Sequence, residues 1–271
     1  MKTRLISVVI ISMVVALLFP PLTHAEEPTS GSEKWEFTIL PYLWMAGLEG
    51  DVVVKGTTSA VDASFGDILD NLDFAYQLHL EAKKGKWAFF IDPTYMKISV
   101  DESATTPLGA TVDAELTSET WLVEGGVFYR IDERAIGDDG VRTLAIDLLG
   151  GVRYNNLKSE TDIKGSEGML DIDADGTKDW VDPIVGGRIQ ARLTEKLIVN
   201  LRGDIGGFDI SGSSDFAWNV LAALGYNLRE NVTLMVGYRA LGVDYDDGNG
   251  DDRFEYDVTM SGPYVGMAYR F

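Results

Sequence analysis

The feature that most constrains this chain is an alternation of apolar and polar residues that recurs from residue 35 to residue 271. Successive side chains of a strand point to opposite faces, so a period of two predicts β-strands with one apolar face. The last stretch, 254–271, places Val265, Met267, Tyr269 and Phe271 at every second position. Such a strand needs neighbours for its backbone hydrogen bonds and an apolar partner for its face. That partner is either a protein core or a lipid bilayer.

Ten stretches show this pattern, at residues 35–46, 74–84, 87–99, 119–131, 144–158, 180–193, 197–208, 216–228, 232–245 and 254–271. Most are about long enough to cross a bilayer at a tilt. The connections at 85–86, 194–196 and 229–231 are short, whereas those at 47–73, 100–118, 159–179 and 246–253 are longer, rich in glycine and acidic. Each group has one exception, the longer connection 132–140 and the brief one 209–215. Short turns on one side and long loops on the other are typical of outer-membrane barrels. A small hairpin, 51–54 with 59–63, and one helical turn within 65–72 are expected in the first loop.

One face of these strands is uncharged and apolar, and the other carries the charges. The period alone does not say which face is inside, because a soluble barrel or sandwich buries its apolar face. Two observations favour lipid on the apolar side. Aromatic residues of that face gather near both ends of the strands, as at two membrane interfaces. The charged face is rich in Gly, Ala and Arg, with carboxylates as partners, which suits a filled lumen. The sequence therefore predicts an all-β, antiparallel, up-and-down transmembrane β-barrel of about ten strands, with eight or twelve as alternatives.

The charged face supplies a set of candidate lumen residues. They are Glu36, His79, Glu81, Asp92, Glu124, Arg130, Asp147, Arg153, Arg188, Arg192, Arg202, Asp204, Arg239 and Arg270. The interior of a narrow barrel is about filled by side chains, and unpaired buried charge is costly. We therefore expect ion pairs that hold the barrel shut. The alternative is a narrow pathway for ions or solutes, lined by fixed charges.

The first 25 residues have the features of a secretory signal peptide. Lys2 and Arg4 precede an apolar run from 6 to 19, and small residues precede an expected cleavage after Ala25. Residues 26–34 are expected to form a flexible lead-in, and 35–271 the barrel domain. Without Lys2 and Arg4, the net charge changes from −20 to −22. Such acidity argues against nucleic-acid binding, and the absence of cysteine excludes disulfides and thiolate metal sites.

Several short motifs carry a family resemblance. The relevant pieces are the stretches 126–130, 151–154, 225–226 and 237–239, each joining Gly to Tyr or Arg, and the final Tyr269-Arg270-Phe271. With the signal peptide, they make the chain resemble small bacterial outer-membrane β-barrels of the OmpA and opacity-protein type. The resemblance implies that Phe271 and Tyr269 form a signal read by the barrel-assembly machinery. Pro263 interrupts the apolar alternation before this signal.

Two acidic segments are candidate cation sites. Asp171, Asp173 and Asp175, followed by Gly176, match the opening of a calcium loop, with Asp182 at its twelfth position. The alternative is a hairpin tip, because Asp175-Gly176 is also a good two-residue turn. A second acidic stretch lies at 244–252. Together these loops could attract divalent cations that bridge the phosphates of lipopolysaccharide. Otherwise they are solvated acidic loops, and no other cofactor is expected.

His79 and Glu81 share the inward face and could form an acid–base pair. The alternative is a histidine that hydrogen-bonds a neighbouring lumen charge, because His79 lies in mid-strand and no nucleophile motif is beside it. The sequence therefore favours a non-catalytic protein of the outer membrane, with a structural or surface-interaction role. Its expected partners are outer-membrane lipid and lipopolysaccharide. The alternatives are a narrow passive channel and a barrel-embedded hydrolase.

Overall fold

The computed structural model describes residues 34–54, 56–105, 111–137, 140–165 and 171–271. The chain is almost entirely β-strand. Its strands are β1 (Glu36–Trp44), β2 (Gly47–Val54), β3 (Thr57–Ala63), β4 (Leu72–Lys84), β5 (Trp87–Thr105), β6 (Thr111–Ala135), β7 (Thr143–Gly165), β8 (Asp171–Arg192), β9 (Leu197–Gly207), β10 (Phe216–Arg229), β11 (Val232–Asp247) and β12 (Phe254–Arg270). A helix, α2 (Phe65–Asp70), and a 3-10 turn, η2 (Gly250–Asp252), complete it. The predicted signal peptide, and the lead-in up to residue 33, lie outside the described residues.

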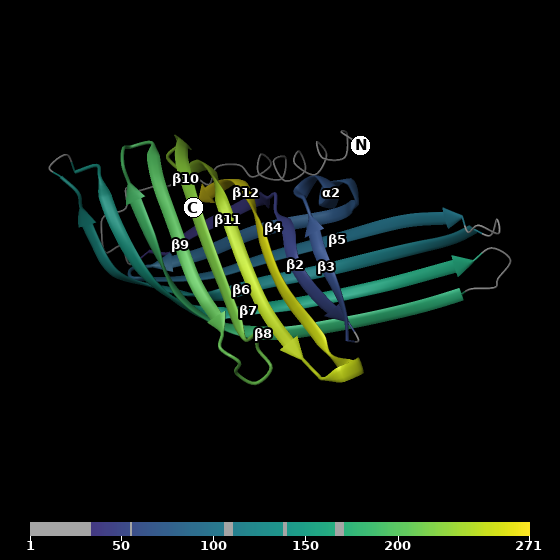
Figure 1. Ribbon diagram of the computed structural model, residues 1–271. Helices are drawn as coiled ribbons and strands as arrows, with labels where there is room; N and C mark the ends of the chain where they lie inside the picture. Colours follow the sequence, from purple (N-terminus) through teal and green to yellow (C-terminus); the bar gives the residue numbers. More distant parts are fainter. Residues whose placement is uncertain (1–33, 55, 106–110, 138–139, 166–170) are drawn as a thin grey trace.

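Ten of these strands close into an antiparallel barrel, in the order β1-β4-β5-β6-β7-β8-β9-β10-β11-β12, with β12 paired back to β1 (Figure 1). The prediction of about ten strands is confirmed. The closing seam extends to the last residue, because the backbone N–H of Phe271 donates to the Phe37 carbonyl at 2.9 Å, and the N–H of Phe37 donates back at 3.2 Å. Closure removes the free sheet edges that a strand of this kind would otherwise expose.

The predicted hairpin and helical turn are both present in the first long connection. β2 continues the chain beyond β1 along the same neighbour, β12, and β3 folds back on β2. Helix α2 follows at once and begins with a capping box between Ser64 and Asp67. The Ser64 hydroxyl and backbone N–H donate to the Asp67 carboxylate at 2.6 and 3.0 Å, and these bonds hold the pKa of Asp67 below its ordinary value.

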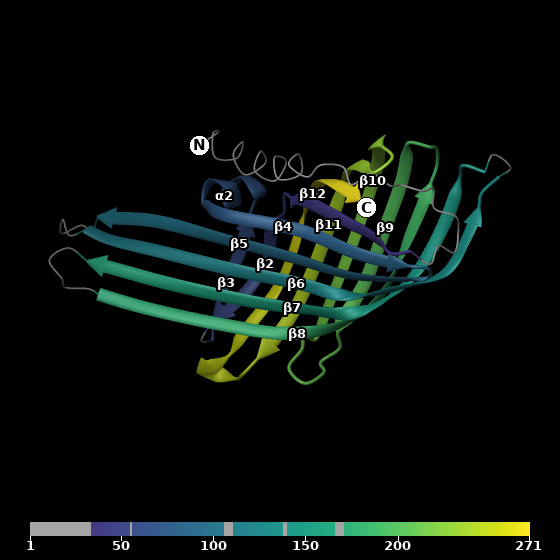
Figure 2. The ribbon, with the colours of Figure 1, turned by 180° about the vertical axis from the view of Figure 1, so that it is seen from behind.

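Four strands extend far beyond the rest. β5, β6, β7 and β8 keep pairing through residues 100–105, 111–118, 159–165 and 171–179, where long loops were expected. We call this four-stranded region the projecting sheet (Figures 1 and 2). The loop prediction was wrong because it relied on apolar alternation. These segments contain few large apolar residues, and what alternates in them is mainly acidic residues on one face, such as Glu115, Asp162 and Glu160. The ladder therefore continues without the run of large apolar residues that marks a half-buried strand.

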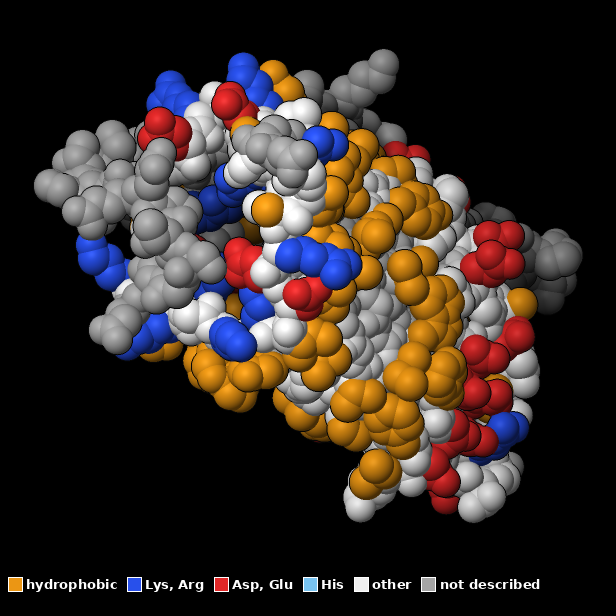
Figure 3. Space-filling view, turned by 90° about the vertical axis from the view of Figure 1, so that its left-hand side faces the viewer, with side chains coloured by type: hydrophobic (Ala, Val, Ile, Leu, Met, Phe, Trp, Pro, Cys, Tyr) orange, Lys and Arg blue, Asp and Glu red, His pale blue; other side chains and the backbone are white. Residues whose placement is uncertain are grey.

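The outer wall of the barrel carries an apolar belt. Side chains such as Leu148, Val185, Val220, Leu224 and Val236 are each about half exposed although they are aliphatic. Figure 3 shows this belt as a broad hydrophobic surface with acidic side chains beyond one edge. Aromatic clusters lie toward both ends, Trp35 with Phe37 and Phe89 at one and Phe74 with Tyr76, Tyr95 and Trp121 at the other. The predicted girdles are therefore present.

The charged face lines the interior. Glu124, Arg153 and Asp182 have no exposed surface, and Asp147 is only 2% exposed. A closed barrel with charges inside and a belt of exposed aliphatic and aromatic side chains outside is suited to lipid rather than to water. In the part of the chain that the structure describes, no helix combines the length and hydropathy that crossing a membrane requires.

Two adjacent glycines in β6 show which side of the strand faces the packed interior. A Cβ on the inward Gly126 would lie 2.6 Å from the Gly150 carbonyl oxygen, whereas a Cβ on the outward Gly125 would have its nearest contact at 3.8 Å. We expect Gly126→Ala to destabilise the barrel by about 1–3 kcal/mol through overpacking, and Gly125→Ala to be tolerated. Urea unfolding of the two variants in detergent measures the difference, and equal midpoints would contradict the assignment of faces.

Candidate functional site: the lumen

A cavity opens at the short-turn end of the barrel. It has a volume of about 470 Å³, and its wall includes Gly85 in the β4–β5 turn and Gly140 in the β6–β7 connection, which lie at the same end of the barrel and place its mouth. We call it the vestibule. The predicted lumen residues on its wall are Glu36, His79, Glu81, Arg130, Arg188, Arg192 and Arg270. Figure 3 shows basic and acidic side chains around a hollow at this end. The vestibule does not continue as a wide channel, because a layer of ion pairs lies above it.

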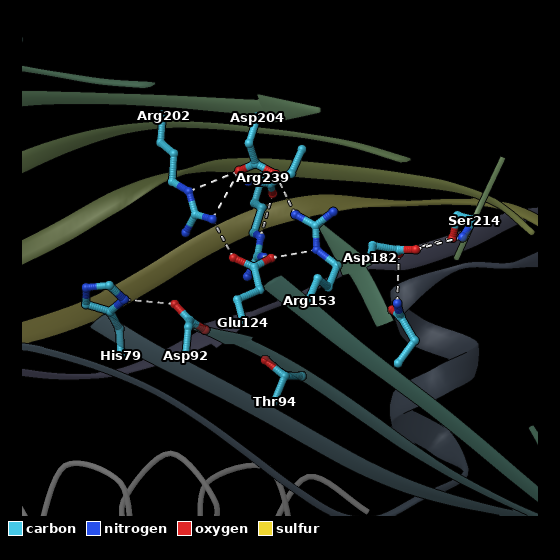
Figure 4. Close-up of polar contacts among 12 residues, drawn as sticks. His79, Asp92, Thr94, Glu124, Arg153, Asp182, Arg202, Asp204, Ser214 and Arg239 are labelled. Atoms are coloured by element: carbon cyan, nitrogen blue, oxygen red, sulfur yellow. Dashed lines mark hydrogen bonds and ion pairs between the residues drawn. The ribbon is translucent and has the colours of Figure 1, made fainter. Parts of the chain in front are cut away.

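Glu124 on β6 is the centre of that layer (Figure 4). Its two carboxylate oxygens accept hydrogen bonds from Arg153 at 3.0 Å, and from Arg202 and Arg239 at 2.6 Å each. These arginines come from β7, β9 and β11, so Glu124 ties one wall of the barrel to the other. All four side chains are at most 8% exposed. Charge-assisted bonds of this kind are the strong ones.

Asp204 on β9 shares two of these arginines. It accepts from Arg153 at 2.6 Å and from Arg202 at 3.1 Å, and the Asn219 amide donates to it at 2.8 Å. The Asn219 carbonyl in turn accepts from Arg239 at 3.0 Å. The three arginines therefore bridge two buried carboxylates, which offsets much of the cost of burying these charges, although Nη1 of Arg153 has no hydrogen-bond partner in the described residues.

A second group lies nearer the vestibule. Asp147 accepts from Arg130 at 2.8 Å and from Arg188 at 2.9 Å, and Arg188 also pairs with Glu81. The Arg188 guanidinium lies over the Phe128 ring at 3.8 Å from its centroid. Apolar and charged side chains thus pack together here, and the Arg188 guanidinium lies over a ring while its N–H groups donate to carboxylates.

His79 belongs to a third group. Its Nδ1 lies 3.0 Å from the Asp92 carboxylate, its Nε2 lies 3.8 Å from Glu81, and its ring is stacked on Phe90. The Tyr42 hydroxyl donates to the other oxygen of Asp92 at 2.5 Å. His79 is therefore hydrogen-bonded to a neighbouring lumen charge, the alternative that the sequence left open beside an acid–base pair.

Eleven of the fourteen predicted lumen residues are connected in these groups, which we call the central network: His79, Glu81, Asp92, Glu124, Arg130, Asp147, Arg153, Arg188, Arg202, Asp204 and Arg239. Glu36 pairs with Lys83 at the mouth, and Arg192 and Arg270 are exposed there. Sequence reasoning missed Tyr42 and Asn219. The same alternation that selected Glu36 on β1 would have placed Tyr42 inside, but neither residue carries a charge.

Above the central network the lumen is filled by an aromatic layer, which was not predicted. It comprises the buried residues Trp44, Leu122, Trp180, Leu241, Val243, Tyr245, Tyr256, Val258 and Tyr264. Trp180 and Tyr245 stack at 4.2 Å between ring centroids, joining β8 to β11 across the interior. Next to the network there is a small cavity of about 60 Å³, which is room for about two waters.

Asp182 has a role other than the one expected. It lies inside, and it accepts from the Ser214 backbone N–H and hydroxyl at 2.8 and 3.0 Å and from the Asn155 amide at 3.0 Å. The Trp180 indole also donates to the Ser214 hydroxyl at 2.8 Å. Asp182 therefore anchors the loop between β9 and β10 (Figure 4).

The calcium-loop and hairpin-tip interpretations of 171–176 both need a turn, and the structure has a strand. Asp175 pairs with Glu160 and Asp173 with Asp162 in the β7–β8 ladder. An extended strand separates Asp175 from Asp182 by about 23 Å, so the four carboxylates cannot share one ion. The side chains of Asp171 and Asp173 lie outside the described residues. Among the side chains that the structure describes, no three His, Asp or Glu residues are grouped to hold a metal ion. Attraction of divalent cations by the other acidic segments stays a prediction.

Comparisons with known proteins bear on the fold. No family model matches the sequence, and no curated protein matches it. Among solved structures, the chain is similar to the outer membrane protease OmpT from Escherichia coli, with 10% sequence identity and a TM-score of 0.53, over 90% of this chain and 99% of that one. The translocator domain of the autotransporter NalP from Neisseria meningitidis is 11% identical, with a TM-score of 0.43, over 89% and 90% of the two chains.

The attachment invasion locus protein Ail of Yersinia pestis is 13% identical, with a TM-score of 0.32, over 89% of this chain and all of that one. Only the first of these three similarities is close enough to support an argument, and at this identity it concerns the fold alone. Together with the closed ring of strands, the inward charges and the apolar belt, it gives this chain the fold of an outer-membrane β-barrel.

Proposed function

We propose that this chain is a non-catalytic protein of the outer membrane of a Gram-negative bacterium, with a structural or surface-interaction role. The observation that carries the proposal is the closed lumen. The central network and the aromatic layer fill the interior in succession, and the cavity lined by residues of the network has a volume of only about 60 Å³. With the interior filled, the large surface that a partner could contact is that of the projecting sheet. Export by the N-terminal signal peptide belongs to the same proposal.

Single-channel recording tests this proposal against the alternative of a narrow passive channel. The vestibule favours that alternative, because it opens the lumen at one end. The purified protein in a planar bilayer is expected to give no stable conductance steps, because five buried arginines and five carboxylates pair across the lumen. Reproducible steps would overturn the closed-lumen role. Fractionation of cells, with heat-modifiable gel migration, tests the location, and recovery in the soluble periplasm would overturn it.

The hydrolase alternative rests on His79 and Glu81. One contact speaks against it: Glu81 pairs with Arg188 and is held in the central network, so it is not a free partner for His79. The contact of His79 Nδ1 with Asp92 does not decide the matter, because catalytic histidines make the same contact. We expect no turnover of peptide or lipid-ester substrates. Any turnover that His79→Ala abolishes would contradict a non-catalytic role.

A further inference from the structure

The projecting sheet leaves two strand edges unpaired in the described residues, a short one on β5 beyond Ile98 and a longer one on β8. In the described residues, β8 pairs with β7 from residue 171 onward, but its ladder with β9 begins only at Ile184 opposite Gly206. Residues 171–183 of β8 therefore have backbone groups without a strand partner on the β9 side. In an extended strand this edge is about 40 Å long. Free edges of this kind are templates for pairing with another chain.

Side-chain contacts hold the part of the edge nearest the barrel, at Lys178 and Trp180. Lys178 pairs with Asp247 on β11, and Trp180 stacks on Tyr245 at 4.2 Å between centroids, with the rings only 15° from parallel. Trp180 also donates to Ser214 in the β9–β10 loop. These contacts use side chains and not the backbone groups of the edge. A strand that docks here would therefore meet an edge already fixed in its binding conformation, which lowers the entropic cost of association.

The surroundings of the edge are acidic. Asp175 and Asp179 on β8 and Asp209 and Asp215 in the β9–β10 loop are exposed. The nearby basic side chains are already paired, Lys178 with Asp247 and Arg253 with Asp246 and Glu255. Like charges disfavour a second copy of this edge and the phosphates of lipopolysaccharide, whereas they attract a cationic chain.

We propose that the β8 edge, residues 171–183, binds a cationic polypeptide segment in extended conformation by adding it as a strand to the projecting sheet. Main-chain hydrogen bonds would supply the pairing, and the flanking carboxylates would select lysine and arginine. This inference rests on the proposed surface-interaction role and names the class of partner for it.

The test uses the full protein in nanodiscs and a synthetic peptide in which lysine alternates with threonine. Binding is expected to slow hydrogen exchange of those β8 backbone amides in residues 175–182 that point away from β7. The amides of β5 residues 100–105, at the opposite edge, should be unchanged. Binding should weaken when salt is raised, because exposed charges are screened over about 10 Å at 0.1 M. A peptide with alternate N-methylated backbone amides, and one with glutamate in place of lysine, should fail to bind.

Two variants provide the matched comparison. The double variant Asp175→Lys with Asp179→Lys is expected to weaken binding of the lysine peptide about tenfold or more. Asp101→Lys, an exposed position on the opposite edge of the same sheet, should leave binding unchanged. Equal loss in both, or equal binding of the N-methylated peptide, would overturn strand addition at β8 in favour of unspecific charge attraction.

A protein that is silent in bilayers but binds none of these peptides would overturn this inference alone. Conductance or turnover would overturn the proposed role whatever the peptide does.

Discussion

Replacing Glu124 with alanine is expected to destabilise the barrel by about 3–5 kcal/mol, because it leaves buried positive charge without its partner. Arg153, Arg202 and Arg239 all donate to this one carboxylate, which has no exposed surface. Asp204 can still hold two of them, but Arg239 would keep only Asn219 and Tyr42 as side-chain hydrogen-bond partners in the described network. The measurement is the urea concentration at the midpoint of unfolding in detergent. Unfolding is monitored by the loss of the compact band on gels of unboiled samples.

The matched control is Glu119→Ala on the same strand. Glu119 pairs with Lys97 at 3.3 Å near the surface, and its side chain is 26% exposed. An exposed ion pair contributes about 0–1 kcal/mol, so this variant should unfold close to the parent protein. Glu124→Gln keeps the shape of the side chain and removes only its charge. Its unfolding midpoint can be measured if the alanine variant does not fold. Equal midpoints for the Glu119 and Glu124 variants would show that the network does not bind the walls together.

Asp182→Ala is expected to release the loop between β9 and β10. This loop contains three non-glycine residues with positive φ, Phe208 at 71°, Asp209 at 52° and Ser211 at 51°. Each such residue costs of order 1 kcal/mol or more and persists only where its surroundings hold it. Asp182 accepts the N–H and hydroxyl of Ser214 and the amide of Asn155. Without it, about 3 kcal/mol of charge-assisted hydrogen bonding is lost.

Limited proteolysis of the folded protein measures this release. The Asp182→Ala variant should be cut within the β9–β10 loop while the rest of the barrel stays resistant. Asp215→Ala, an exposed residue of the same loop, is the control and should remain uncut. Asp182→Asn keeps one acceptor oxygen and should be intermediate. Resistance of the Asp182→Ala loop would mean that the turn is held by its own hydrogen bonds, such as the one from the Ile210 N–H to the Ser213 hydroxyl at 2.9 Å.

The membrane-spanning part of the fold could be predicted because lipid imposes a regular pattern. Every second residue of strands such as β11 must be apolar to face lipid, so Val232, Leu234 and Val236 mark one face, and Arg239 marks the other. The same alternation named eleven of the residues that form the central network. Here the sequence signal is local, and the environment on each side of the strand is nearly uniform.

The projecting sheet could not be predicted in this way. Asp113, Glu115 and Glu160 lie on one exposed, acidic face of the sheet, so the apolar face that distinguishes a membrane-spanning strand from a loop is missing there. Asp182 was misinterpreted for a related reason. Its spacing from Asp171 fits a calcium loop only if the chain turns, and the β7–β8 ladder keeps it extended. Backbone pairing with a neighbour, rather than side-chain type, determines the conformation there.

The sequence by itself determined the class of fold, the face of each spanning strand and the identity of most lumen charges, because these follow from a period of two along single strands. Only the tertiary structure decided which charges meet. Glu124 finds arginines on β7, β9 and β11, and the partner of Trp180 is Tyr245 on β11. These contacts depend on strand register, on tilt and on closure between β1 and β12, which bring residues far apart in sequence to one level of the lumen. The physical reason is that register is a property of pairs of strands, so the closed lumen and the free edge of β8 are properties of the assembled barrel.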